Sequence, residues 1–173
     1  MSKYEIENVK LTAPKLDRKD LEYAMTYRYA CKKFDSTKKI SEEDWNSILT
    51  AARLSPTSLG FEPYELLVIH NPEIREKMKA HGWGIHAGLE ASHLVVFLTR
   101  KKIDLVFDSP YIRHIQEEVK QLPAEIDAAY REKYAQFTTS DYKTFESERA
   151  AFDWASKQAY IVMANMMTMA AYE

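Results

Sequence analysis

The stretch that decides the fold is "SERAAFDWASKQAYIVMANMMTMAAYE", residues 147–173. Drawn as a helix, it carries apolar side chains on more than one face, among them Trp154, Ile161, Val162 and Met166. Its longest apolar run, residues 159–172, is shorter than the roughly 20 residues that span a bilayer and is interrupted by polar residues. We therefore predict a long buried helix from about Ser147, lying at the centre of the fold or in a dimer interface.

This helix has no stop signal, because Gly, Asn, Pro and basic residues are absent from its final turn. We expect that the stretch is the middle of a longer fold and that the chain is incomplete at its C-terminus. Gln158 is polar within the apolar run and needs a hydrogen-bond partner if it is buried. A ligand or a second subunit is the expected partner.

Two strands are predicted upstream, "YELLVIH" at residues 64–70 and "HLVVFLTR" at residues 93–100. Helices are predicted at 17–28, at 41–54 with Ser41 as the cap, from Pro72, at 84–92, and through most of the chain after Ile103. Two strands alone make a marginal sheet, so we expect further strands from a partner chain or from additional sequence.

Composition limits the function classes. The chain has 173 residues, 46% of them hydrophobic, which predicts a single domain over 1–173. Its net charge of -2 gives no field for a phosphate backbone, which argues against nucleic acid. The first residues lack the apolar stretch of a secretory signal, and Cys31 is the only cysteine. These features predict a cytoplasmic protein without a membrane partner.

Several short motifs have both a functional and an ordinary interpretation. "RYACKKF" (28–34) offers cations to a phosphate, or is a solvated basic turn. "SPTS" (55–58) offers hydroxyl groups, or simply stops a helix. Tyr130, Tyr134 and Phe137 form an aromatic stripe that either packs in the core or stacks on a flat substrate. The histidines between 81 and 93 lack the spacing of metal ligands, so no metal site is expected.

In order along the chain, these segments resemble the FMN-dependent nitroreductase family. The resemblance lies in "RYACKKFD" (28–35), "AARLSPTSLGFEPYELLVI" (51–69), "ASHLVVFLT" (91–99) and "DWASKQAYIVMANMM" (153–167). It implies an α+β fold in which helices wrap a central, mainly antiparallel sheet. It also implies an intertwined homodimer with a long central helix and a strand exchanged from the C-terminal tail.

The resemblance also implies the cofactor site. Arg28 would bind the FMN phosphate, with Tyr29 and Ala30 at the same end, and Lys32 would lie by the pyrimidine edge of the flavin. A cation there favours the negative charge of the reduced ring. The other subunit would contribute Pro56, Thr57, Ser58 and Gln158. Tyr134 and Phe137 are the candidate substrate contacts.

The activity implied is hydride transfer from NAD(P)H through FMN to flat acceptors such as nitroaromatic compounds or quinones. No catalytic acid is expected, because the flavin carries the chemistry. The sequence leaves one alternative open. Ala30 lacks the hydroxyl that the family usually offers, and the family continues beyond its central helix, so the chain could be a truncated, flavin-free or inactive dimeric remnant or binding module.

Overall fold

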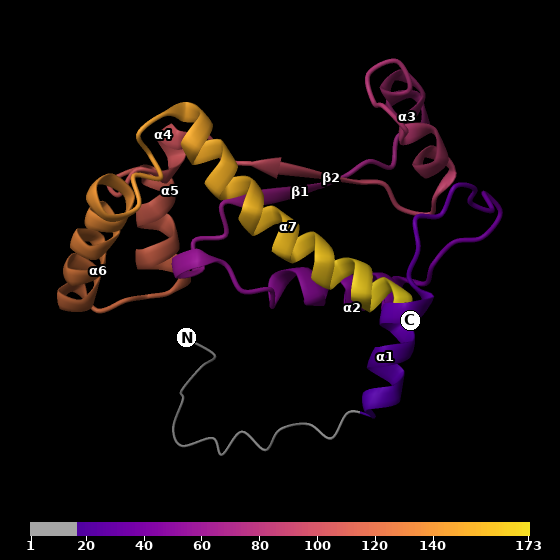
Figure 1. The fold of residues 1–173 in the computed structure, drawn as a ribbon, viewed down its shortest axis with the longest axis horizontal. Helices are drawn as coiled ribbons and strands as arrows, with labels where there is room; N and C mark the ends of the chain where they lie inside the picture. The colour runs from indigo at the N-terminus through magenta and orange to yellow at the C-terminus, as the bar shows by residue number, and fades with distance from the viewer. Residues whose placement is uncertain (1–16) are drawn as a thin grey trace.

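The computed structural model describes residues 17–173, in which helices pack against one face of a small antiparallel sheet (Figure 1). The helices are α1 (Arg18–Tyr27), α2 (Glu42–Arg53), α3 (Pro72–Met78), α4 (Lys102–Leu105), α5 (Pro110–Arg113), α6 (Ala124–Gln136) and α7 (Glu148–Tyr172). The strands are β1 (Tyr64–Val68) and β2 (Val95–Thr99). Short 3₁₀ segments lie at Ser58–Gly60 and Ile85–Glu90, and π-helical turns at His114–Val119 and Phe137–Asp141 extend α5 and α6. The predicted α+β class is confirmed.

Polar caps set the helix boundaries where the sequence predicts them. The side chain of Asp17 accepts a hydrogen bond from Lys19 N at 2.9 Å, and that of Ser41 accepts one from Asp44 N at 3.0 Å. Ser147 caps α7 in the same way. Each cap satisfies a backbone N–H that the first helical turn leaves free, which typically stabilises a helix by about 1 kcal/mol.

The sheet is antiparallel, with Leu66 opposite Phe97 at the centre of the register. These two residues, with Tyr64, Val68 and Val95, turn toward α2 and α7 and pack on the buried Trp45, Ile48, Ala52, Val162 and Met166. On the opposite face Leu67 and Leu98 are about half exposed. Within residues 17–173 the sheet has only these two strands. Helices therefore cover one face of the strand pair.

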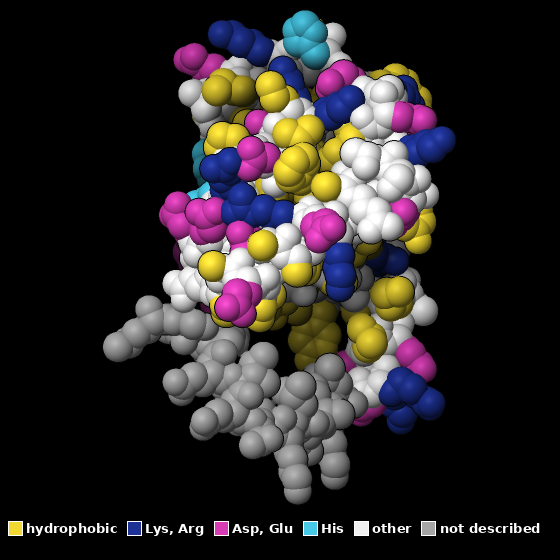
Figure 2. Space-filling view, turned by 90° about the vertical axis from the view of Figure 1, so that its left-hand side faces the viewer, with side chains coloured by type: hydrophobic (Ala, Val, Ile, Leu, Met, Phe, Trp, Pro, Cys, Tyr) yellow, Lys and Arg dark blue, Asp and Glu magenta, His cyan; other side chains and the backbone are white. Residues whose placement is uncertain are grey.

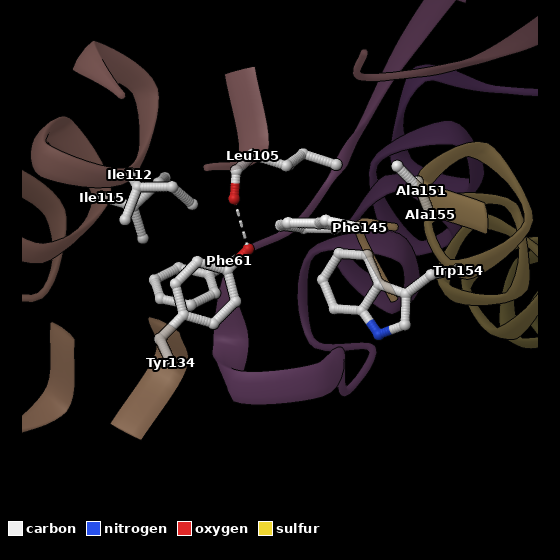
Figure 3. Packing of buried hydrophobic residues seen from close by; sticks show 9 residues of the cluster. All are labelled: Phe61, Leu105, Ile112, Ile115, Tyr134, Phe145, Ala151, Trp154 and Ala155. Atoms are coloured by element: carbon white, nitrogen blue, oxygen red, sulfur yellow. Dashed lines mark hydrogen bonds between the residues drawn. The ribbon is translucent and has the colours of Figure 1, made fainter. Parts of the chain in front are cut away.

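α7 runs diagonally across the molecule and connects two core regions (Figure 1). Its C-terminal half packs on α2 and the sheet, as described above. Its N-terminal half contributes Trp154 and Ala155 to a second buried cluster, whose other members include Phe61, Leu105, Ile112, Ile115, Tyr134 and Phe145. Figure 3 shows this second region, where the Tyr134 hydroxyl donates to the Leu105 carbonyl at 2.6 Å. Both cores therefore depend on one helix.

A single chain does not bury α7 on several sides, and the place of this helix in a dimer interface stays a prediction. Phe152, Tyr160 and Met167 are 53%, 66% and 45% exposed, whereas Ala151, Ala155, Ala159 and Val162 on the other side are buried. One chain covers one side of the helix, and its small alanine side chains allow close packing there. In α1, likewise, Ala24 is buried while Leu21 and Met25 are half exposed.

Residues 102–141, here called the helical unit, form the end of the molecule that carries α4, α5 and α6. On its surface Lys and Arg side chains are mixed with Asp and Glu (Figure 2). Arg131 of α6 pairs with Asp127 at 2.7 Å and also contacts Glu117 of the preceding π-helical turn. Arg131 therefore links α6 to the chain before it. No helix within residues 17–173 is both long and apolar enough to cross a bilayer.

Candidate functional site

Residues 28–34, here called the basic segment, begin where α1 ends. Arg28 is the C-cap of α1, and its N–H donates to Ala24 O at 3.2 Å. Its guanidinium Nη1 donates to Thr168 Oγ1 at 3.3 Å, which ties the segment to the last turns of α7. Tyr29, Ala30 and Lys32 are exposed. A hydrogen bond with Cys31 raises the pKa of the Tyr29 hydroxyl. The segment therefore presents its polar groups to solvent beside the C-terminal end of α7.

The "SPTS" loop contacts the middle of α7. Gln158 is buried, and its Oε1 accepts a hydrogen bond from Ser58 N at 2.8 Å. Asn165 Nδ2 donates to Ser55 Oγ at 2.9 Å, and that hydroxyl donates to Ala51 O at 2.7 Å. The expectation that a ligand or a second subunit supplies the partner of Gln158 is therefore wrong for its carbonyl oxygen. A backbone N–H from a distant part of the same chain satisfies it.

The predicted cofactor residues thus fall into two clusters along α7. The first contains Arg28, Tyr29, Ala30 and Lys32, anchored at Thr168, and the second contains Pro56, Thr57 and Ser58, anchored at Gln158. The two anchors, Gln158 and Thr168, are ten positions apart on the helix, which corresponds to roughly 15 Å at about 1.5 Å per residue. A single chain therefore holds the clusters at two separate points of one helix.

Directly after the loop, residues 59–62 form a turn with unusual backbone angles, called here the left-handed turn. Leu59, Gly60 and Glu62 have φ values of 58°, 61° and 47°. Glycine adopts such angles freely, whereas other residue types do so at about 1–2 kcal/mol each. Sequence reasoning missed this turn, because neither Leu nor Glu is typical of left-handed positions. Contacts from elsewhere must hold it.

A groove lies between the basic segment, β2 and α7, with a volume of about 850 Å³. Lys33, Phe34, Trp45, His93 and Met167 are among the residues that line it. The His93 ring stacks on Trp45 with centroids 4.2 Å apart. Burial, assisted by the neighbouring His70, lowers the pKa of His93. Lys33 lines this groove, whereas Lys32, the cation that the resemblance places by the flavin, is exposed and is not among the lining residues.

The aromatic stripe belongs to the core. Tyr134 is 1% exposed and packs on Phe61 with ring centroids 4.5 Å apart. Burial raises the pKa of its hydroxyl, which is already bonded to Leu105. Phe137 is partly buried against the same core. These positions favour the core-packing interpretation over the substrate contact for Tyr134.

The histidines do not form a metal centre in the part of the chain that the structure describes. Among residues 17–173 no group of three or more His, Cys, Asp or Glu side chains is placed to hold a metal ion. His93 instead contacts Trp45, His70 and Ser92.

Comparison with known proteins places these features in a family. Residues 25–173 match the model described as "Nitroreductase family". The chain belongs to the nitroreductase family. The matched range contains both clusters, the left-handed turn and the whole of α7.

A curated nitroreductase relative is "Putative NAD(P)H nitroreductase YfkO" of Bacillus subtilis, which is 45% identical over 149 residues. The match covers 86% of this chain and 67% of the relative. About a third of the relative's length therefore lies outside the match.

Solved structures of nitroreductases share the fold. The crystal structure of a protein named "putative nitroreductase ydfN", from Bacillus subtilis, superposes with a TM-score of 0.70 at 17% identity, over 88% of this chain and 70% of that chain. A second, named a "putative nitroreductase in complex with FMN" and from Exiguobacterium sibiricum, has a TM-score of 0.66 at 19% identity, with coverages of 88% and 70%. At these identities the likeness concerns the fold.

Proposed function

We propose that this nitroreductase-family chain binds FMN and acts as an NAD(P)H-dependent oxidoreductase on flat acceptors such as nitroaromatic compounds and quinones. The observation that carries the proposal is the family match over residues 25–173, because that range contains both clusters of predicted cofactor residues. The name of the Bacillus subtilis relative supports the choice of NAD(P)H, and the Exiguobacterium sibiricum complex supports the choice of FMN.

The side chains of the first cluster suit a phosphate. A guanidinium group has five N–H donors, and within residues 17–173 that of Arg28 uses one, on Thr168. The remaining donors suit the paired oxygens of a phosphate. The exposed Lys32 would supply the cation by the pyrimidine edge of the flavin. Arg28 would therefore hold the phosphate end of FMN, while Thr168 fixes the orientation of its side chain.

The second cluster suits the ring end of the cofactor. Gln158 Oε1 is engaged by Ser58, but its Nε2 makes only a long bond of 3.4 Å to Trp154 O. The amide therefore retains donor capacity toward a polar ring edge. Pro56 and Thr57 precede Ser58 in the loop, and their backbone would face the flavin. When bound, FMN would accept a hydride from NAD(P)H and pass reducing equivalents to the acceptor.

We further propose that the complete site forms in a homodimer, with one cluster from each chain. The separation of the two clusters along α7 supports this arrangement. The uncovered side of α7 supports it too, because Phe152, Tyr160 and Met167 form an apolar strip at helical spacing. A partner helix on this strip would bring Arg28 of one chain toward the loop of the other.

The test is a flavin titration of the purified protein followed by anaerobic addition of NADPH or NADH. We expect flavin absorption to remain with the protein, to bleach on reduction and to return when a nitroaromatic compound or a quinone is added. Arg28→Ala should weaken FMN binding, Arg28→Lys should weaken it less, and Arg53→Ala, an exposed arginine on α2, should not. A colourless protein that never consumes NAD(P)H would refute the oxidoreductase proposal and favour a flavin-free binding module.

A further inference from the structure

Side chains of the helical unit donate hydrogen bonds to backbone carbonyls of the left-handed turn. Lys120 Nζ donates to Leu59 O at 2.6 Å, and the Tyr130 hydroxyl donates to the same oxygen at 3.0 Å. The Tyr111 hydroxyl lies 2.9 Å from Phe61 O and 2.7 Å from Glu62 O. Three side chains distant in sequence therefore converge on one short turn. They provide the external contacts that its backbone angles require.

Lys120 occupies a confined place within this arrangement. Its ammonium nitrogen lies 4.6 Å from the centroid of the Phe61 ring and 5.1 Å from that of Tyr130, so two aromatic faces surround the charge. A Cβ atom at Gly60 would be 3.3 Å from the same nitrogen. Burial lowers the pKa of the Lys120 ammonium group, and the nearby Glu62 carboxylate opposes that shift. The lysine is thus part of a packed contact rather than a solvated surface charge.

The turn is directly connected to the loop of the second cluster. Gly60 N donates to Thr57 O at 2.9 Å, and Glu62 N donates to Thr57 Oγ1 at 3.1 Å. On the other side, Ser58 N is held by Gln158 of α7. The backbone of residues 57 and 58 is therefore fixed between α7 and the gripped turn. A shift of the Leu59 carbonyl would move the groups that the proposed flavin site uses.

We propose that Lys120 is a positioning residue for the cofactor site. Together with Tyr130, it holds the Leu59 carbonyl and so fixes the backbone of Pro56, Thr57 and Ser58 in the geometry that receives the flavin. This inference rests on the proposed function for its ligand. It adds a residue from the helical unit, outside both clusters, to the set that shapes the site.

The test compares Lys120→Met and Tyr130→Phe, which each remove one donor to Leu59 O, with two controls. The controls are Lys133→Met, on α6, and Tyr142→Phe, just after the π-helical turn that extends α6, and both positions are exposed. Hydrogen exchange of the Gly60 amide, measured without flavin, reports the turn itself. We expect about tenfold faster exchange and about tenfold weaker FMN binding in both test variants, since one charged or buried hydrogen bond is worth roughly that factor. Lys120→Arg keeps a charged donor at this position, so its Gly60 exchange rate and its FMN affinity should both lie close to those of the wild type.

The outcomes separate the positioning role from the proposed function. Gly60 exchange within about twofold of wild type in both test variants would overturn the inference, as would faster exchange with unchanged FMN affinity. An equal loss of FMN affinity in Lys133→Met would overturn it too, because the effect would then be general. If the wild-type protein binds no FMN, the proposed function fails, and the exchange rates alone decide whether Lys120 and Tyr130 hold the loop.

Discussion

Replacing Arg75 by Met should destabilise the fold by about 3 kcal/mol through lost hydrogen bonds of one guanidinium group. Arg75 Nε donates to Ile69 O at 2.8 Å, and Nη1 donates to Ala91 O at 2.7 Å and Leu89 O at 3.1 Å. Nη2 donates to Ser92 O at 3.3 Å. The side chain thus ties α3 to the end of β1 and to the approach to β2.

The magnitude follows from these distances. A hydrogen bond from a charged donor contributes about 1.5–3 kcal/mol, and the two bonds of 2.8 Å or less account for roughly 3 kcal/mol at the lower end of that range. The longer bonds add less. For a domain of this size, a loss of this magnitude lowers Tm by about 6–12 °C.

Urea unfolding followed by circular dichroism is the suitable assay, since it gives the free energy of unfolding and its slope. Arg53→Met, at an exposed position of α2, is the control and should change stability by less than about 0.5 kcal/mol. Arg75→Lys should recover only part of the loss, because a single ammonium group cannot reach carbonyls from both sides. A loss below about 1 kcal/mol in Arg75→Met would refute this reasoning.

Three further predictions concern Gln158, Trp45 and the partly buried His93. Gln158→Leu leaves a loop N–H without its acceptor and should cost about 1–3 kcal/mol in urea unfolding, while Gln136→Leu, exposed on α6, should be near neutral. Trp45→Ala empties a buried position and should cost about 3–5 kcal/mol, whereas Trp83→Ala, at a fully exposed tryptophan, should leave Tm within about 2 °C. Burial lowers the pKa of His93 in the fold, so stability should fall as pH decreases through its unfolded value of 6.5, and a pH series should show less of this decline in His93→Phe.

Local sequence signals predicted the elements well. Ser41 and Ser147 are typical caps, and both cap helices in the structure. The spacing of Trp45, Ile48, Leu49 and Ala52 is typical of a buried stripe on one helix face. Three of these residues are buried on α2, and Leu49 is partly buried against the same cluster. Such features depend on residues within one or two turns of each other, which is the range over which sequence patterns carry information.

The site was less predictable, because its decisive contacts are long-range. Gln158 finds its partner in Ser58, and the left-handed turn depends on Lys120 and Tyr130. No periodicity relates such positions, and Leu59 carries no local sign of a positive φ. The family resemblance supplied the list of candidate site residues. It did not supply the contacts with Thr168 and Gln158 that hold them at two separate points of α7.

Because α7 is one continuous helix, its length and twist fix the distance and the relative orientation of the two clusters. Each residue inserted between Gln158 and Thr168 would move one anchor by about 1.5 Å and rotate it by about 100° relative to the other. Substitutions on the uncovered side of this segment keep that register, whereas single insertions or deletions destroy it. We therefore expect length changes here to disturb the site more than changes of side chain.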